Sequence, residues 1–186
     1  HVYWGGTSLG IDAEEFCRTS GVTTAIDTGS AGPGNFAGFR KHVIEPSQVR
    51  ILAYLHVSFA GIYAFSKTIM VGESEEIRLM APADAVKVAE ANRDVLVGIK
   101  VRVGRNSSGA SGAHPLDIAL QVADETGMPL MCHIDHPPPS YEEVIRSAWN
   151  NRPELAELKH RAAVAQELVK MARAGDKPQV EFRGAV

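Results

Sequence analysis

This 186-residue chain has few cysteines and few aromatic side chains. It also lacks long apolar runs and a large excess of charge of either sign. The two cysteines, Cys17 and Cys132, are too few for a disulfide framework, so we expect a reducing, cytoplasmic location. No uninterrupted apolar run approaches the ~20 residues that cross a bilayer, which argues against a membrane protein. There are 19 basic and 22 acidic residues and a net charge of −3, so the chain has no basic stripe that would favour nucleic acid as a partner.

The overall composition is that of an ordinary globular protein. Apolar residues make up 45% of the chain and charged residues 22%, which excludes a disordered or collagen-like sequence. The pattern along the chain is strand, loop and helix, repeated, and the strands are almost continuously apolar. Such a pattern is typical of parallel strands that are buried on both faces and joined by helices.

The expected elements can be placed by their residue types and end signals. We expect strands at 1–3, 22–27, 50–57, 96–103 and 129–135, helices at 11–20, 35–43, 82–92, 115–126, 140–149 and 153–174, an ambiguous stretch at 58–74, and a last short strand at 180–182. A complete barrel of this kind has ~250 residues and eight units. The sequence therefore predicts an α/β fold, a partial (β/α)8 TIM-type barrel of about five βα units over residues 1–150, with a helical tail over 151–186.

Polar side chains gather where the predicted strands end, which is where catalytic groups lie in βα folds. They are His1, Asp27, His56, Ser58, Lys100, Arg102, His133 and Asp135. Lys100 is the most informative, because an ammonium in the middle of an apolar strand is costly to desolvate. Alternation places it on one face with Gly98 and Arg102. This lysine suits a Schiff base, an ion pair with a nearby carboxylate, or a carbamate that bridges two metal ions.

His133 is the second candidate, since a histidine at a strand end can bind metal or transfer protons. Alternation puts it on one face with Met131 and Asp135 and turns Cys132 toward the helices, so we expect a bound metal to contact Lys100 and His133 rather than either cysteine. The other histidines have no paired spacing and are interpreted as incidental: His42, His56, His114, His136 and His160. The glycine-rich loop at 29–34 could bind an anion, although a tight turn between strand and helix explains it equally.

Several long stretches of the chain resemble the amidohydrolase superfamily, in particular its dihydroorotase-like and amidohydrolase/deacetylase branch. The resemblance runs from His1 to about Val144, and the most characteristic stretches are HVYWGGTSLG, TTAIDTGSAGPGNFAGF, LVGIKVRVG, LDIALQVADETGMPL and HIDHPPPSYEEV. It implies a (β/α)8 barrel with one or two divalent metal ions, usually zinc, and a small-molecule substrate.

The resemblance also assigns residues. His1 resembles the second histidine of the family's His-x-His pair, Lys100 matches the lysine that is carboxylated and bridges both metals, and His133 matches the histidine ligand of the fifth strand. A first histidine of the pair, a later histidine ligand and the aspartate that serves as general base have no counterpart here. We therefore expect an incomplete or truncated copy of the enzyme, and the resemblance leaves open whether this chain is itself active.

Three functions are compatible with these residues. The first is a metal-dependent hydrolase of amide or related C–N bonds, and of esters in some members, with a binuclear centre bridged by the carboxylated Lys100. The second is a non-catalytic, degenerate barrel fragment. The third is a Schiff-base lyase that uses Lys100. Because a partial barrel has an unpaired strand edge, a homo-oligomer is a further expectation.

Overall fold

The computed structural model describes residues 1–65, 68–71, 73–136 and 153–175. The chain divides into two compact units, His1–Val144 and Ile145–Val186. The predicted domain boundary at residue 150, the predicted helix at 140–149 and the predicted strand at 180–182 lie outside the described residues. None of the helices in the described part of the chain has the length and hydrophobicity needed to cross a bilayer.

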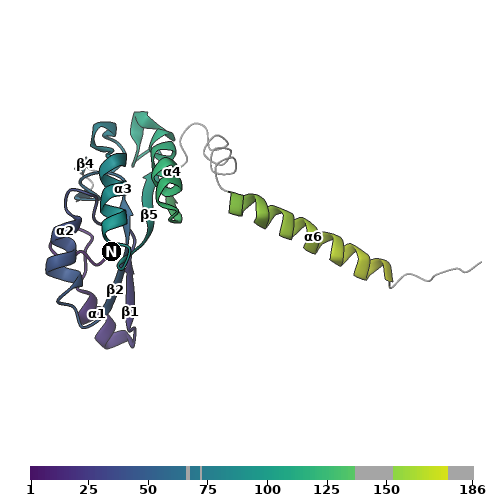
Figure 1. Cartoon of the computed structure of the whole chain (residues 1–186), viewed down its shortest axis with the longest axis horizontal. Coiled ribbons are helices and arrows are strands. Elements are labelled where there is room, and N and C mark those ends of the chain that lie inside the picture. Colours follow the sequence, from purple (N-terminus) through teal and green to yellow (C-terminus); the bar gives the residue numbers. More distant parts are fainter. Residues whose placement is uncertain (66–67, 72, 137–152, 176–186) are drawn as a thin grey trace, which may run out of the picture. The chain divides into compact units, whose positions relative to one another are not determined.

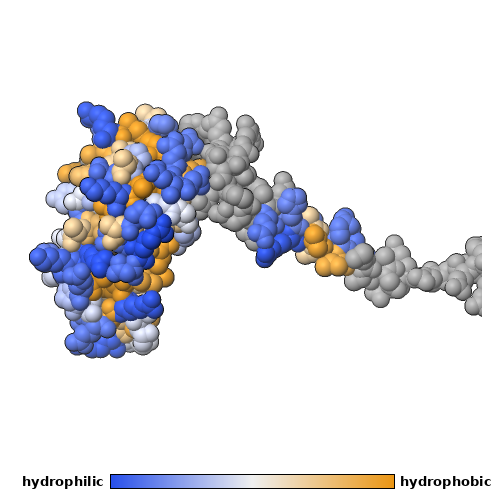
Figure 2. Space-filling view, viewed as in Figure 1, coloured by the Kyte–Doolittle hydropathy of each residue, from blue (hydrophilic) through white to orange (hydrophobic). Residues whose placement is uncertain are grey.

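Strands and helices alternate along the first unit as the sequence predicts (Figure 1). The strands are β1 (Thr24–Asp27), β2 (Arg50–His56), β3 (Ala64–Phe65), β4 (Met70–Val71), β5 (Leu96–Val103) and β6 (Leu130–Ile134). The α-helices of this unit are α1 (Ala13–Ser20), α2 (Phe36–Phe39), α3 (Pro82–Ala91) and α4 (His114–Thr126), and shorter helical turns span Arg40–Ile44, Ile77–Leu79 and Gly109–Ser111. In the second unit, α6 covers Pro153–Gly175, and its Val164, Leu168 and Val169 side chains are exposed. Figure 2 shows hydrophobic surface on this helix between hydrophilic stretches.

Four parallel strands form the main sheet in the order β1-β2-β5-β6, which is a curled half-barrel. The parallel half-barrel predicted from the sequence is therefore confirmed. Within the described residues the sheet has four strands rather than the expected five, because the first segment, 1–3, is not a strand. The backbone N–H of Val2 donates to the Asp27 carboxylate at 2.7 Å instead of to a neighbouring strand. A short antiparallel hairpin of β3 and β4 lies in the stretch that was ambiguous.

The hydrophobic core lies between one face of the sheet and the helices, and α3 and α4 lie side by side over it (Figure 1). Alternation along β2 and β5 explains the sorting, because every second residue of each strand points to this helix face. Leu55, Ile99, Val101 and Val103 are fully buried there. On the opposite face Ile26 of β1 is 50% exposed. We call that opposite face, which carries Tyr54, Lys100, Arg102 and His133, the site face; register pairs Tyr54 with Gly98 and Arg102 with His133.

Phe39 joins the N-terminal segment to this core. Its ring is completely buried, stacks on Tyr3 with a centroid separation of 4.5 Å, and meets Phe36 edge-on at 6.2 Å. Aromatic pairs of this geometry add to the free energy that burial alone supplies. The segment before α1 is thus held by packing as well as by its hydrogen bonds.

We expect Phe39→Ala to lower the free energy of unfolding by about 3–5 kcal/mol, because it leaves a cavity and removes both ring contacts. Urea denaturation followed by circular dichroism measures the loss. Phe16→Ala is the matched control, since Phe16 on α1 is 53% exposed, and its effect should stay within about 1 kcal/mol. Equal losses in the two variants would contradict this description of the core.

Candidate active site

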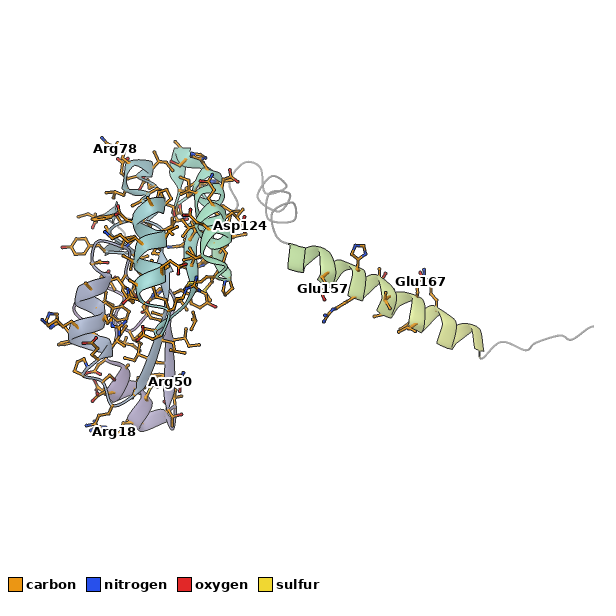
Figure 3. The ribbon with its side chains drawn as sticks, viewed as in Figure 1. Arg18, Arg50, Arg78, Asp124, Glu157 and Glu167 are labelled. Carbon is orange, nitrogen blue, oxygen red and sulfur yellow. The ribbon has the colours of Figure 1, made fainter. Side chains whose placement is uncertain are left out.

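The candidate site lies at the carboxyl ends of the parallel strands. Arg50 is the first residue of β2, and Arg78 lies in the helical turn Ile77–Leu79. Figure 3 shows these two residues toward opposite ends of the first unit. His56 is the last residue of β2 and pairs in register with Lys100 of β5. Arg102 pairs with His133 one step further along. Register partners on parallel strands project to the same side, so these four side chains share the site face.

Lys100 is buried, with 3% of its surface exposed. Its aliphatic stem packs on Gly29, where an added Cβ would lie 2.4 Å from Lys100 Cγ and 2.5 Å from Lys100 Cβ. Among the residues that the structure describes, no carboxylate forms an ion pair with Lys100, so the ion-pair interpretation of this lysine has no support there. Burial lowers the pKa of Lys100, and the nearby Glu73 carboxylate only partly offsets this effect.

Two carboxylates, Glu73 and Asp135, form ion pairs with Arg102. Arg102 Nη1 lies 3.2 Å from Glu73 Oε2, and Arg102 Nη2 lies 3.5 Å from Asp135 Oδ2. Burial raises the pKa of Glu73, and the guanidinium of Arg102 opposes that rise. Glu73 was missed from the sequence because it lies in the ambiguous stretch 58–74, and its place in the site depends on how that stretch folds.

His1 is held through a chain of hydrogen bonds that ends on Asp27. The Ser30 hydroxyl donates to Asp27 Oδ2 at 2.7 Å, and His1 Nδ1 lies 2.9 Å from Ser30 Oγ. Because that hydroxyl hydrogen is already donated to Asp27, His1 Nδ1–H is the donor in the second bond. A neutral His1 ring therefore keeps its lone pair on Nε2, which is the arrangement that a metal-binding histidine needs.

Asp27 organises the turn that follows β1. Its fully buried carboxylate accepts hydrogen bonds from the backbone N–H groups of Val2, Gly29 and Ser30, at 2.7, 3.0 and 2.6 Å, as well as from the Ser30 hydroxyl. Two amides of the glycine-rich loop at 29–34 are thus bonded within the protein. The loop is a tight turn between strand and helix, and these two amides serve Asp27 rather than an external anion.

His133 is exposed on β6, beside Arg102 and one register step from Lys100. Burial lowers the pKa of His133, and the positive charges of Arg102 and Lys100 lower it further, so the ring is held neutral. Among the described residues, no cluster of three or more His, Cys, Asp or Glu side chains could hold a metal ion on its own.

The two cysteines differ in their distance from these groups. Cys132 pairs with Val101 of the helix face and packs against the core, as alternation predicts. Burial raises the pKa of its thiol to about 11, and nearby Lys100 opposes that rise. Cys17 is buried on α1.

His56, which the sequence analysis treated as incidental, is completely buried beside Lys100. Its Nδ1 accepts a hydrogen bond from the Ser58 backbone N–H at 3.0 Å. Burial lowers the pKa of His56 well below its usual value, and Lys100 and Arg102 add to that effect. The ring is neutral, so its proton is on Nε2. The signal that could have found it is its position as a strand-end residue directly opposite Lys100.

Asp27→Asn tests the turn. The new amide NH₂ would face N–H and O–H donors, so we expect a loss of about 1.5–3 kcal/mol in unfolding free energy, the range for hydrogen bonds to a charged group. Asp84→Asn, at an exposed residue in the first turn of α3, should change it by less than about 0.5 kcal/mol. Thermal and urea unfolding measure both, and a neutral Asp27→Asn would contradict the role given to Asp27.

Gly29→Ala tests the packing of Lys100. Gly29 has φ of +90°, and its Cβ would meet the near end of the Lys100 side chain, which cannot swing away. Gly127→Ala is the matched control, because Gly127 has φ of +65° and open space around it. The backbone penalty of about 1–2 kcal/mol applies to both, and overpacking should add about 1–3 kcal/mol at Gly29 only. Equal losses in urea unfolding would contradict this contact.

Comparison with known proteins finds relatives that are named as deacetylases. A deacetylase of Brucella anthropi is 36% identical over 148 residues, and a deacetylase of Agrobacterium fabrum is 35% identical over the same length. Each match covers 78% of this chain and 35% of the relative, so the chain spans about a third of the length of these proteins. No family model matches the chain.

Solved structures give the same result. A dihydroorotase crystal structure superposes with a TM-score of 0.68 at 34% identity, covering 78% of this chain and 38% of the other. An adenine deaminase superposes with a TM-score of 0.66 at 27% identity, covering 75% of this chain and 37% of the other. The resemblance expected from the sequence is confirmed by these matches.

Proposed function

We propose that this chain is part of a metal-dependent hydrolase. The proposal is supported by its homology to deacetylases and by its structural similarity to a dihydroorotase and an adenine deaminase of the amidohydrolase superfamily. The substrate is a small molecule with an amide, a related C–N bond or an ester. The observation that carries the proposal is Lys100, a buried amine at the carboxyl end of a half-barrel strand that has no ion-pair partner among the described residues.

Three side chains of this chain suit a divalent metal such as zinc. They are Nε2 of His1, the side chain of Lys100 after carboxylation, and the ring of His133. The His1–Ser30–Asp27 chain supports this assignment, since metal-binding histidines usually donate their other ring nitrogen to a second group that fixes their orientation. When bound, the metal polarises the carbonyl of the substrate and lowers the pKa of water.

The remaining residues prepare Lys100 for this role. Arg102 forms ion pairs with Glu73 and Asp135, and of these two carboxylates Glu73 is the one that influences the pKa of Lys100. Packing on Gly29 fixes the direction of the lysine stem. Burial lowers the pKa of Lys100 and so favours the neutral amine, which is the form that reacts with CO2. The resulting carbamate would offer two oxygens to metal ions.

The same amine would also suit a Schiff-base lyase, which needs a neutral lysine but no metal. The similarity to deacetylases favours the hydrolase. Borohydride trapping of a carbonyl substrate on Lys100 in metal-free protein would support the lyase instead.

Zinc titration by calorimetry tests the proposed ligands. We expect Lys100→Ala and His133→Ala to weaken zinc binding by about ten-fold or more, since even loss of a supporting residue around a metal site has an effect of that size. His42→Ala is the control, because His42 is exposed on a helical turn away from the strand ends. Unchanged affinity in both site variants would place any zinc site elsewhere.

Product release tests the activity itself. The chain is assayed for acetate from N-acetylated amino acids and acetyl esters, for ring opening of dihydroorotate and for ammonia from adenine. We expect slow release that requires both added zinc and Lys100. Equal release from the zinc-loaded protein, the metal-free protein and Lys100→Ala would contradict the proposed function.

A further inference from the structure

His56 contains a buried hydrogen-bond donor that has no partner within the described residues. Its side chain is completely buried, and its Nδ1 accepts from the Ser58 backbone N–H at 3.0 Å. The proton of the neutral ring is therefore on Nε2. Nε2 is shielded from solvent and makes no hydrogen bond in the described part of the chain. Buried donors are rarely left unpaired, and each exception indicates a function or an absent group.

The neighbour of this donor is Lys100. The two residues are register partners on adjacent parallel strands, so their side chains leave the same face about 4.8 Å apart at the backbone. Lys100 is also buried and has no carboxylate partner among the described residues. In the described part of the chain, an imidazole N–H without a hydrogen-bond partner and an amine without a carboxylate partner thus lie on neighbouring strands. What this pair lacks is an acceptor.

We propose that His56 is the positioning residue for a carbamate on Lys100, with Nε2–H donating a hydrogen bond to one carbamate oxygen. This inference rests on the proposed function, from which it takes the carboxylation of Lys100. In that reaction the neutral Lys100 Nζ attacks the carbon of dissolved CO2, a C–N bond forms, one C=O π pair becomes the oxygen anion, and one N–H proton passes to water. The product adds the acceptor that His56 Nε2–H lacks.

The tautomer of His56 separates this role from that of a metal ligand. A ligand nitrogen must offer a lone pair, and the Nδ1 lone pair of His56 is already bonded to Ser58. His1 shows the opposite arrangement, since its Nδ1–H donates to Ser30 and its Nε2 lone pair is available. His56 is therefore suited to donate to the carbamate, and His1 is suited to bind metal.

Two substitutions of His56 test its Nδ1 and Nε2 positions separately. In His56→Asn, the side-chain oxygen can occupy the position of Nδ1 and accept from Ser58, but no donor reaches the position of Nε2. In His56→Gln, the amide nitrogen reaches the position of Nε2, and the acceptor for Ser58 is lost. A carbamate role requires the Nε2 end of the ring, whereas a purely structural role requires the Nδ1 end.

The experiment supplies ¹³C-bicarbonate to the full chain, with and without zinc, and measures the carbamate resonance by ¹³C NMR. Lys100→Ala identifies the signal by its absence, and urea unfolding monitors folding. We expect carbamate occupancy to fall about ten-fold in His56→Asn, as expected for loss of a hydrogen bond to a charged group. In His56→Gln it should stay within about three-fold of the wild type, even where that variant is less stable.

The outcomes separate the two proposals. A carbamate signal that is equal in the wild type and in His56→Asn would overturn the role of His56 and leave the proposed function intact. The same holds if only His56→Gln loses the signal. If the wild type gives no signal that Lys100→Ala removes, with or without zinc, the carboxylation of Lys100 is wrong, and the role of His56 is wrong with it.

Discussion

The ion pair between Arg102 and Glu73 is the interaction on which the chemistry of this site depends. Glu73 is 2% exposed and lies close enough to Lys100 to influence its pKa. Without Arg102, that carboxylate would attract a proton to Lys100 and form the ordinary pair of a buried lysine. The guanidinium is always charged and binds Glu73 at 3.2 Å. Lys100 is left as a desolvated amine that forms no ion pair with any carboxylate in the described part of the chain, as the proposed carboxylation requires.

The parallel sheet makes this arrangement possible because it separates two environments by alternation. On the helix face of β5, Ile99, Val101 and Val103 are fully buried in the core and hold the strand in place. On the site face of the same strand lie the polar side chains of Lys100 and Arg102. A rigid apolar side thus fixes the positions of polar groups only one residue away. Sites built on strands in this way are held more accurately than sites on loops.

The sequence predicts the strands of the main sheet, the alternation on β5 and the direction of Cys132, because these follow from local periodicity. It also predicts Lys100, because an ionisable residue inside an apolar strand breaks the pattern. It does not predict Glu73, which comes from a stretch without periodicity. It also does not predict the role of Asp27, because one of its four donors is the backbone N–H of Val2, 25 residues away in the sequence. The segment at 1–3 was taken for a strand because its hydrogen bond to a carboxylate has no local signal.

The two histidines at the site illustrate why residue type alone is insufficient. In His1 a side-chain hydroxyl, already committed to Asp27, makes Nδ1 the donor. In His56 a backbone N–H makes Nδ1 the acceptor. The same ring therefore offers a lone pair at Nε2 in one case and a proton in the other. The Nδ1 partner of His1 lies in the loop after β1, and that of His56 lies directly after β2. The fold of these two loops therefore decides which histidine suits a metal ion and which suits an anion on Lys100.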